Sequence, residues 1–330
     1  MKENLNILML SKWHVHAAGY AAQLKSAGRV NITAVWDEEP ERGKQWAGEL
    51  GAAFESDLAK AVARADVDAV VCDAPTTMHR EVLTAAANAG KHIFTEKALA
   101  PTLAECREIA GAVQRAGVKF VISMPHRNKP VYGYAKQLMD DGSLGVVSYA
   151  RLRNAHGGAS ANWLPAYWYD ESKAAGGAMM DLGCHPMYLA AYLLGRPKRV
   201  AALFNSLTSK SVDDNAVGMI EFANGAVATV ETGFVTPYSP NYFEVYGTEG
   251  SLIVHDADAK VKSSKLDWAR DWASVPESAM PPVPASPIEQ FVNACLDGAP
   301  IAFGMDEAIS LTELLEGAYI ANKTNTQVLF

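Results

Sequence analysis

The chain is poor in cysteine, short of positive charge and without long apolar runs. Its four cysteines form no Cys-x-x-Cys pair and lie far apart, so we expect reduced, mostly buried thiols rather than a disulfide scaffold. Lys and Arg number 29 against 37 Asp and Glu, and the net charge of −8 argues against nucleic acid and membrane surfaces as partners. No apolar stretch approaches the ~18 residues of a membrane span. The start Met1-Lys-Glu-Asn-Leu lacks the apolar core of a signal peptide, so we expect a cytoplasmic protein.

The first 123 residues alternate short β-branched runs with alanine-rich helical stretches. This pattern predicts a parallel, doubly wound α/β sheet, a Rossmann-type domain over residues 1–123. The predicted strands are 5–10, 31–36, 52–54, 68–72, 91–95 and 118–123, and the predicted helices are 17–27, 41–50, 56–65, 77–89 and 102–116. Glycines 28, 51, 90 and 117 follow these helices, as C-terminal caps should.

Residues 124–330 have a different texture and predict an α+β domain with an open, mainly antiparallel sheet. Strand-like runs follow one another directly, and Asn224-Gly225 is a strong hairpin signal between two of them. The predicted strands are 145–153, 199–205, 215–222, 226–234, 242–247 and 251–255, and the predicted helices are 177–194, 287–296 and 305–322. Two domains of this kind place the default ligand site in a cleft between them.

The first strand-to-helix turn lacks the glycines that a dinucleotide-binding fold normally carries there. The stretch Ser11-Lys-Trp13-His-Val-His16 stands where Gly-x-Gly-x-x-Gly is expected, and Trp13 would obstruct a close backbone approach to a pyrophosphate. A helix N-terminus remains, and Ser11, His14 and His16 can assist phosphate binding. Asp37, after the second strand, is placed to hold a ribose 2′-hydroxyl, which favours NAD over NADP.

Three ionisable side chains from two distant segments suit acid/base chemistry. Lys97 follows the strand-like run Lys91-His-Ile-Phe-Thr, at the sheet edge where open α/β sheets bind ligands. Asp181 and His185 stand four residues apart, which on a helix places them on one face. The alternatives are ordinary ones: Lys97 as a solvated strand end, Asp181 as a helix N-cap, and His185 as a core histidine.

Further candidates surround these three. At the ligand-binding edge of the first domain we expect cofactor contacts from Pro75, Thr76, His79, Glu96 and Lys97. Substrate contacts are expected from residues that combine hydrogen-bond donors with flat apolar faces, a mixture that suits carbohydrate rings: Arg127, Arg153, His156, Trp163 and Tyr167. His14 and His16 alone are weak evidence for a metal without a clear third ligand, and we expect none.

Taken in order, these motifs resemble the glucose-fructose oxidoreductase / inositol dehydrogenase / rhizopine-catabolism (Gfo/Idh/MocA) family. The resemblance rests on Asp37 and then, along nearly the whole chain, on Ala74-Pro75-Thr76-Thr77-Met78-His79, Ala89-Gly90-Lys91-His92, Thr95-Glu96-Lys97, Gly142-Ser143-Leu144-Gly145 and Gly176-Gly177-Ala178 leading to Asp181 and His185. It implies that Lys97, Asp181 and His185 line a sugar or polyol site. The chain departs from the family at the missing glycines and at Ala98, where the family has proline.

The residues and the resemblance together predict an NAD(P)-dependent oxidoreductase that oxidises a secondary hydroxyl of a sugar, inositol or related polyol. His185 would take the hydroxyl proton, Asp181 would orient it or bind a neighbouring hydroxyl, and Lys97 would stabilise the developing alkoxide. Two alternatives use the same residues: a redox-neutral enzyme that cleaves a glycoside by transient oxidation and elimination, and a sensor of nucleotide or sugar without turnover. An exposed face on the second sheet predicts a homo-oligomer, and the resemblance implies a homodimer or a homotetramer.

Overall fold

A computed structural model describes residues 3–208 and 210–330 of the chain. The chain divides into two compact units. The first runs to Met124 and includes Ala285–Thr312, and the second comprises Pro125–Pro284 and Glu313–Phe330. The sequence-based division after residue 123 places the segment 285–312 with the second domain, whereas in the structure it packs in the first unit.

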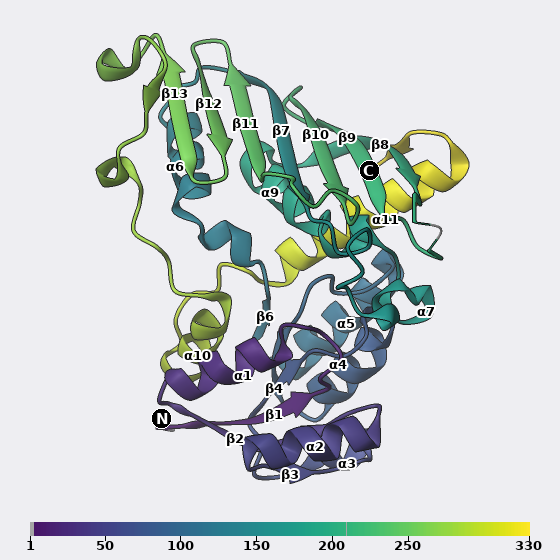
Figure 1. The fold of residues 1–330 in the computed structure, drawn as a ribbon. Coiled ribbons are helices and arrows are strands. Elements are labelled where there is room, and N and C mark those ends of the chain that lie inside the picture. The colour runs from purple at the N-terminus through teal and green to yellow at the C-terminus, as the bar shows by residue number, and fades with distance from the viewer. Residues whose placement is uncertain (1–2, 209) are drawn as a thin grey trace. The chain divides into compact units, whose positions relative to one another are not determined.

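The first unit is built on a six-stranded parallel sheet in the order β3-β2-β1-β4-β5-β6 (Figure 1). The central strands β1 and β4 consist almost entirely of apolar residues and are buried on both faces, as parallel strands require. The strands are β1 (Leu5–Leu10), β2 (Val30–Trp36), β3 (Ala53–Phe54), β4 (Ala69–Cys72), β5 (His92–Thr95) and β6 (Phe120–Ile122).

Helices cover both faces of this sheet, because the right-handed crossovers leave β1 in opposite directions along the sheet. The helices are α1 (Ala17–Ser26), α2 (Pro40–Leu50), α3 (Leu58–Ala63), α4 (His79–Asn88), α5 (Leu103–Ala116) and α10 (Pro287–Asp297). Helix α10 packs beside α1 and against β6, while α4 packs beside α5. Gly51 and Gly117 end α2 and α5 in the left-handed conformation, with φ of 71° and 64°, which confirms their prediction as caps.

The second unit holds a nine-stranded sheet in the order β14-β13-β12-β11-β7-β10-β9-β8-β15. All pairs are antiparallel except β10 with β7, so the expectation of a mainly antiparallel sheet is confirmed. Its strands are β7 (Val147–Ala155), β8 (Pro197–Asn205), β9 (Asn215–Phe222), β10 (Val227–Gly233), β11 (Tyr242–Gly247), β12 (Gly250–His255), β13 (Asp258–Ser263), β14 (Ala273–Ser274) and β15 (Val328–Leu329). The strands β13, β14 and β15 are absent from the sequence-based prediction.

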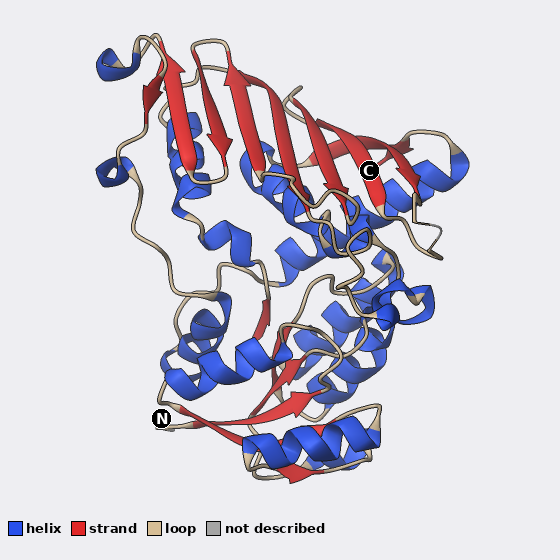
Figure 2. Ribbon diagram, in the orientation of Figure 1, coloured by secondary structure: helices blue, strands red, loops and turns tan. Residues whose placement is uncertain are grey.

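Helices of the second unit lie against one face of its sheet, and the other face stays open (Figure 2). They are α6 (Pro130–Asp140), α8 (Ala178–Asp181), α9 (Cys184–Leu194) and α11 (Met305–Thr324), whose first turns belong to the first unit. The short α7 (Glu171–Ala174) packs instead against the 3-10 helix Ala166–Tyr169. The single helix predicted over 177–194 is therefore two, since the chain turns at Leu182 and Gly183. Among the described residues, no helix combines the length and the apolar character needed to span a bilayer.

Candidate functional site

The turn after β1 keeps a tight conformation without glycine. Ser11 adopts φ of 72°, in the left-handed region that glycine normally occupies, and its Oγ accepts a hydrogen bond from Trp13 N at 3.0 Å. Trp13 is only 3% exposed, so its indole packs in the interior. Helix α1 begins a few residues later at Ala17, whose N–H bonds to His14 O at 3.1 Å. No side chain caps this end of the helix, so its positive dipole end faces the turn, where it favours an anion.

Asp37 lies at the end of β2 as expected, but its carboxylate is already engaged. Arg42 donates to both oxygens, at 2.7 and 2.9 Å, and the backbone N–H groups of Lys12 and Glu39 donate to one oxygen each. A ribose hydroxyl that reaches Asp37 therefore has to replace one of these donors. Arg42 also pairs with Glu38, so the guanidinium has a second acidic partner if Asp37 exchanges it.

Glu96 is the centre of a buried polar cluster at the carboxyl ends of β1 and β5. It is 1% exposed and accepts a short hydrogen bond from the Tyr20 hydroxyl, while His16 Nδ1 lies 3.2 Å from its Oε2. Lys97 Nζ lies 3.7 Å from the other oxygen, Oε1. Burial alone would raise the pKa of Glu96, but the neighbouring His14, His16 and Lys97 outweigh it and hold that pKa well below its usual range.

The same cluster contains a set of possible metal ligands. Among the described residues, one ligand atom each of His14, His16 and Glu96 lies within 4.8 Å of the others, so Glu96 is the third ligand type that the sequence pattern lacked. The Lys97 ammonium beside Glu96 and the positive end of α1 both oppose a cation here. Both features favour an anion instead, and the expectation of no metal stays a prediction.

Asp73, at the end of β4, is a second buried carboxyl beside this cluster. Within the part of the chain that the structure describes, neither of its oxygens has a hydrogen-bond partner. Burial, with a contribution from the charge of Glu96, raises the pKa of Asp73 well above its usual value. The two carboxyl groups thus differ, because Asp73 favours the neutral form and Glu96 the ionised form.

The buried His79 ring holds the loop that carries Lys97 by hydrogen bonds. His79 is 1% exposed, and its two ring nitrogens lie 3.1 Å from Leu99 O and 3.0 Å from Ala74 O. Burial lowers the pKa of His79. Lys97 is itself buried, and the peptide bond between it and Ala98 is cis. Pro75 and the buried Thr76 precede His79 at the start of a short 3-10 helix, Thr76–Met78.

In the second unit, His185 belongs to a compact group on α9. Its Nδ1 lies 2.8 Å from the Tyr188 hydroxyl, which also accepts a hydrogen bond from His126 N at 3.0 Å. The His126 ring stacks on His185 with centroids 4.2 Å apart. Next to this pair, the Arg127 guanidinium lies over the Tyr192 ring at 4.3 Å. Sequence reasoning missed Tyr188, although it stands three residues after His185 and so shares its helix face.

Asp181 ends α8 rather than sharing a continuous helix with His185, so the helix-face argument for that pair is wrong. Its Oδ2 accepts a hydrogen bond from Trp168 Nε1 at 3.1 Å, and the Cys184 thiol donates to its backbone carbonyl. Gly183, not Asp181, is the N-cap of α9. The break comes from the sequence itself, since Gly183 N bonds back to Ala178 O and closes α8 after one turn.

The remaining predicted substrate contacts divide between two places. His156 packs between the Phe234 ring, at a centroid distance of 5.2 Å, and the exposed Trp163 ring, at 4.6 Å. Tyr167 lies beside Trp168, the partner of Asp181. Arg153 instead pairs with Glu231 and donates to Ser239 Oγ. It follows the buried Leu152 on β7, so its side chain points to the open face of the sheet, opposite the face that α9 covers.

Comparison with known proteins agrees with these observations. The sequence pattern described as "Oxidoreductase family, NAD-binding Rossmann fold" of the Gfo/Idh/MocA group matches residues 13–124, and that of the Gfo/Idh/MocA C-terminal domain matches residues 132–253. The chain belongs to the Gfo/Idh/MocA oxidoreductase family. Its first unit is accordingly an NAD-binding Rossmann fold, despite the missing glycines.

Individual relatives cover most of the chain. A 1,5-anhydro-D-fructose reductase of Ensifer adhaerens is 29% identical over 74% of this chain and 75% of its own length. A scyllo-inositol 2-dehydrogenase (NAD(+)) of Bacillus subtilis is 28% identical over 90% and 87%, respectively. Among solved structures, GenD2 from gentamicin A biosynthesis in complex with NAD has 26% identity and a TM-score of 0.84, covering 99% of this chain and 97% of that one.

The residues of the first unit fit NAD. The left-handed Ser11 preserves the turn, α1 begins at the right place for a phosphate, and Asp37 stands at the end of β2. Arg42 and Tyr20 complete the surroundings of that turn, and sequence reasoning missed both. Each had a local signal, since Tyr20 stands four residues after His16 and Arg42 five after Asp37.

Proposed function

We propose that the protein oxidises a secondary hydroxyl group of a sugar, inositol or related polyol, with NAD as the cofactor. The observation that carries this proposal is that each unit of this Gfo/Idh/MocA oxidoreductase holds a group suited to the chemistry: the Rossmann fold has buried Lys97 at its ligand-binding edge, and the second unit has His185, whose Nδ1 lies 2.8 Å from the Tyr188 hydroxyl. NAD, when bound, supplies the hydride acceptor. A protein that uses the NAD pool in this way would act in the cytoplasm.

The chain's own residues handle the proton. Because Tyr188 engages Nδ1 of His185, we assign Nε2 as the atom that takes the hydroxyl proton of the substrate. We propose that the Lys97 ammonium stabilises the negative charge that develops on the substrate oxygen. The ionised Glu96 keeps the positive charge of Lys97 in place, since their charged groups lie 3.7 Å apart.

Asp181 and its neighbours are proposed to bind the rest of the ring. The carboxylate is oriented by Trp168 and can accept hydrogen bonds from a second hydroxyl group. His156 and Trp163 offer an imidazole and a flat apolar face, the combination that sugar rings favour. Arg127 is proposed for the same pocket. A role for Arg153 would require it to leave Glu231 and Ser239.

The test is NADH formation, followed by absorbance, with a panel of sugars and inositols. Lys97→Ala and His185→Ala should each lower turnover by about a hundredfold or more while the protein stays folded by circular dichroism. Arg80→Ala is the matched control, since this exposed arginine pairs with Glu105 and Glu108 of the neighbouring helix. Near-normal turnover in either site variant would remove the role assigned to that residue.

Two results would instead favour the alternatives. Conversion of a glycoside without NADH accumulation points to the redox-neutral cleavage reaction. Stabilisation of the protein by a sugar or by NAD, with no product from any substrate, points to a sensor.

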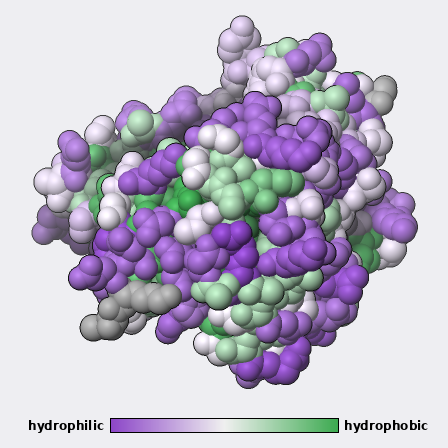
Figure 3. Space-filling model, turned by 90° about the horizontal axis from the view of Figure 1, so that it is seen from below, coloured by the Kyte–Doolittle hydropathy of each residue, from purple (hydrophilic) through white to green (hydrophobic). Residues whose placement is uncertain are grey.

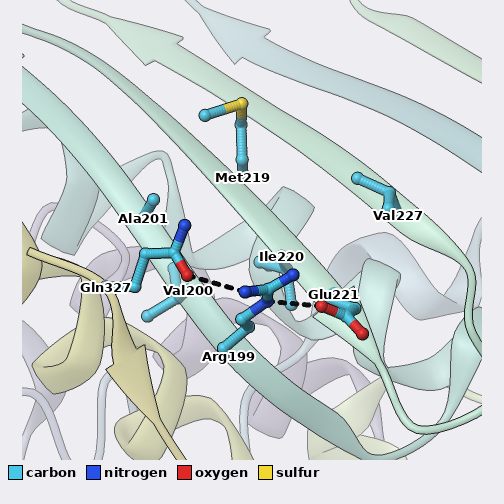
Figure 4. A pocket seen from close by; sticks show the side chains of 8 residues that line it. All are labelled: Arg199, Val200, Ala201, Met219, Ile220, Glu221, Val227 and Gln327. Atoms are coloured by element: carbon cyan, nitrogen blue, oxygen red, sulfur yellow. Dashed lines mark hydrogen bonds and ion pairs between the residues drawn. The ribbon is translucent and has the colours of Figure 1, made fainter.

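We also propose that a second copy of the chain covers the open face of the nine-stranded sheet. Large apolar side chains stand exposed there, with Leu203 at 73% and Met219 at 55%. Met219 and Val227 line a pocket of about 140 Å³ together with Arg199, Glu221 and Gln327. Figure 4 shows these side chains on neighbouring strands of the sheet and at the chain's end. The side of the molecule seen from below in Figure 3 differs from this face, since hydrophobic groups there are interrupted by hydrophilic ones. A self-complementary apolar face of this kind is typical of symmetric oligomers.

Sedimentation of the purified protein tests this assembly. A dimer or tetramer is expected for the natural chain, and Met219→Glu, which places a charge in the middle of the apolar face, should yield monomers. Glu108→Lys, on an exposed helix of the first unit, is the control and should leave the mass unchanged. A natural chain that sediments as a monomer at high concentration contradicts the proposal.

A further inference from the structure

The one-turn helix α8 carries Asp181 and cannot hold its shape by itself. It has only four residues, Ala178–Asp181, and a single turn fixes several backbone dihedrals for very few hydrogen bonds. Its N-cap, Gly177, has no side chain with which to bond the first N–H groups. Some other residue has to satisfy these donors, because unpaired buried N–H groups are costly.

Asp213 supplies acceptors for three of these N–H groups. Its Oδ1 accepts from Gly177 N at 2.9 Å, its Oδ2 from Met179 N at 2.8 Å, and its backbone carbonyl from Ala178 N at 2.7 Å. Three consecutive N–H groups thus end on one residue that lies outside the helix, just before β9. Burial raises the pKa of Asp213, and the hydrogen bonds from Met179 and Tyr319 oppose that rise.

Tyr319 of α11 holds the Asp213 carboxylate in its orientation. Its hydroxyl donates to Asp213 Oδ1 at 2.7 Å and accepts from Gly177 N at 3.1 Å. The two glycines before α8 are required by this closeness. A Cβ at Gly176 would stand 2.2 Å from the Tyr319 hydroxyl oxygen, and one at Gly177 would stand 1.9 Å from the Asp213 carbonyl oxygen.

The residues that follow are hydrogen-bonded to Gly177 and Ala178. Asp181 N bonds to Gly177 O at 3.0 Å, and Gly183 N bonds to Ala178 O at 2.8 Å. Thr232 of β10 donates to the same Ala178 carbonyl at 3.3 Å. The backbone of Asp181 and the turn that leads to α9 are therefore fixed by way of Gly177 and Ala178, which Asp213 holds.

We propose that Asp213 is a positioning residue, which fixes the Asp181 backbone and the entry to α9 through its hydrogen bonds to Gly177, Ala178 and Met179. This inference rests on the proposed function for its effect on turnover, but not for its effect on the segment itself. Asp213 does not touch the substrate. Without the Asp213 carboxylate, α8 and the turn before α9 can move, which shifts the side chains of Asp181 and His185 from their positions.

Asp214 provides a matched control beside it. Its carboxylate also accepts two backbone N–H groups, from Leu207 at 2.8 Å and Thr208 at 2.7 Å, and it also stands at the start of β9. These bonds hold the loop before β9 and make no contact with α8. Asp213→Asn and Asp214→Asn are therefore the same chemical change in neighbouring residues, and each replaces one acceptor oxygen with an amide donor.

The first readout is turnover. Asp213→Asn should lower kcat/KM by at least about tenfold, because one lost acceptor facing Met179 N is replaced by a repelling donor. Asp214→Asn should leave kcat/KM within about twofold. The affinity for NAD, measured by calorimetry, should not change in either variant, because the residues that would hold NAD lie in the other unit.

The second readout does not need activity. Cys184 is buried between Asp181 and His185, so its alkylation by iodoacetamide, located by mass spectrometry, reports opening of this segment. Asp213→Asn should accelerate labelling of Cys184 about tenfold relative to Asp214→Asn, with Cys72 unchanged in both. This result stands even if no polyol is turned over by the natural chain, in which case only the proposed function fails.

Equal behaviour of the two variants in both readouts would overturn the proposal. If Asp213→Asn does not fold, Tyr319→Phe decides, since it removes only the hydroxyl that locks the carboxylate. Tyr319→Phe should then accelerate Cys184 labelling in the same direction, and natural labelling rates in that folded variant would likewise refute the role of Asp213.

Discussion

Asp73 and Glu96 occupy the ends of adjacent parallel strands, and their pKa values are shifted in opposite directions. Glu96 N bonds to Cys72 O at 3.0 Å, which joins the two strand ends directly. Glu96 is ionised among His14, His16 and Lys97, whereas Asp73 favours its neutral form because of burial and the charge of Glu96. The two pKa values move apart because nearby positive charges compensate Glu96, whereas Asp73 has burial and the negative charge of Glu96 to contend with.

The raised pKa of Asp73 predicts that this residue costs stability at neutral pH. A folded pKa above the unfolded value of about 3.9 means that the folded state binds the extra proton. The stabilising contribution of Asp73 is therefore complete below about pH 4 and is lost as the pH rises through the folded pKa. Asp73→Asn keeps the size of the side chain and cannot ionise. Over that pH window, its free energy of unfolding should rise relative to that of the natural chain by up to about 1.4 kcal/mol per pH unit.

Urea unfolding of both proteins at several pH values, from about pH 4 upward, measures this difference. All other titrating groups are shared, so they cancel in the comparison. Asp68→Asn is a control, since Asp68 precedes the same strand and accepts a hydrogen bond from Asn6 N. Parallel stability curves for Asp73→Asn and the natural chain would contradict the assignment of a neutral Asp73.

Cofactor choice should depend on the pair of Asp37 and Arg42. In Asp37→Ser the Arg42 guanidinium loses its main acceptor and becomes available to a ribose 2′-phosphate, so the affinity ratio of NADP to NAD should rise about tenfold. The double variant Asp37→Ser/Arg42→Ala should lose this gain, because no cationic fork remains. Calorimetric titration with both nucleotides checks the prediction, and an equal loss of affinity for NAD and NADP in Asp37→Ser would disprove it.

The sequence predicts the architecture well because most elements have a local signal. Alternating β-branched and alanine-rich runs mark the parallel sheet, and Gly51 and Gly117 mark helix ends by a conformation that few other residues adopt. The small edge strands β14 and β15, of two residues each, carry no such pattern and exist only through their neighbours in the sheet. The break between α8 and α9 also escapes prediction, since the backbone bond from Gly183 N to Ala178 O that closes α8 has no signature in the hydrophobic periodicity.

The candidate site follows a similar division. Strand ends point to Lys97, Glu96 and Asp37, because the topology alone brings the carboxyl ends of parallel strands to one edge. The partners that set their chemistry come from elsewhere in the fold, as with Ser123, which bonds Tyr20, and Trp168, which bonds Asp181. No periodicity encodes such contacts, so they require coordinates.

Substitutions of Ser11 measure how much stability the turn after β1 loses by having no glycine at this position. The left-handed φ of 72° costs a non-glycine residue about 1 kcal/mol, while the Oγ bond to Trp13 N returns about as much. Ser11→Gly should therefore be close to the natural chain in stability, and Ser11→Ala, which keeps the strain and loses the bond, should be about 1 kcal/mol less stable. Thermal unfolding of the three proteins gives the order, and an alanine variant as stable as the glycine variant would contradict this account.

Tyr188 should control the imidazole that we assign to the proton. Its hydroxyl joins His185 Nδ1 to His126 N, so Tyr188→Phe removes one hydrogen bond from each without changing the packing of the ring. We expect kcat to fall about tenfold while KM changes little, because the substrate still binds but Nε2 is no longer held in one tautomer and orientation. Steady-state kinetics of NADH formation measures both constants. Tyr192→Phe, a change on the same helix in the tyrosine that stacks under Arg127, serves as the control and should keep kcat within about twofold. If Tyr188→Phe alters KM alone, Tyr188 belongs to substrate binding and the His185 tautomer is fixed by another group.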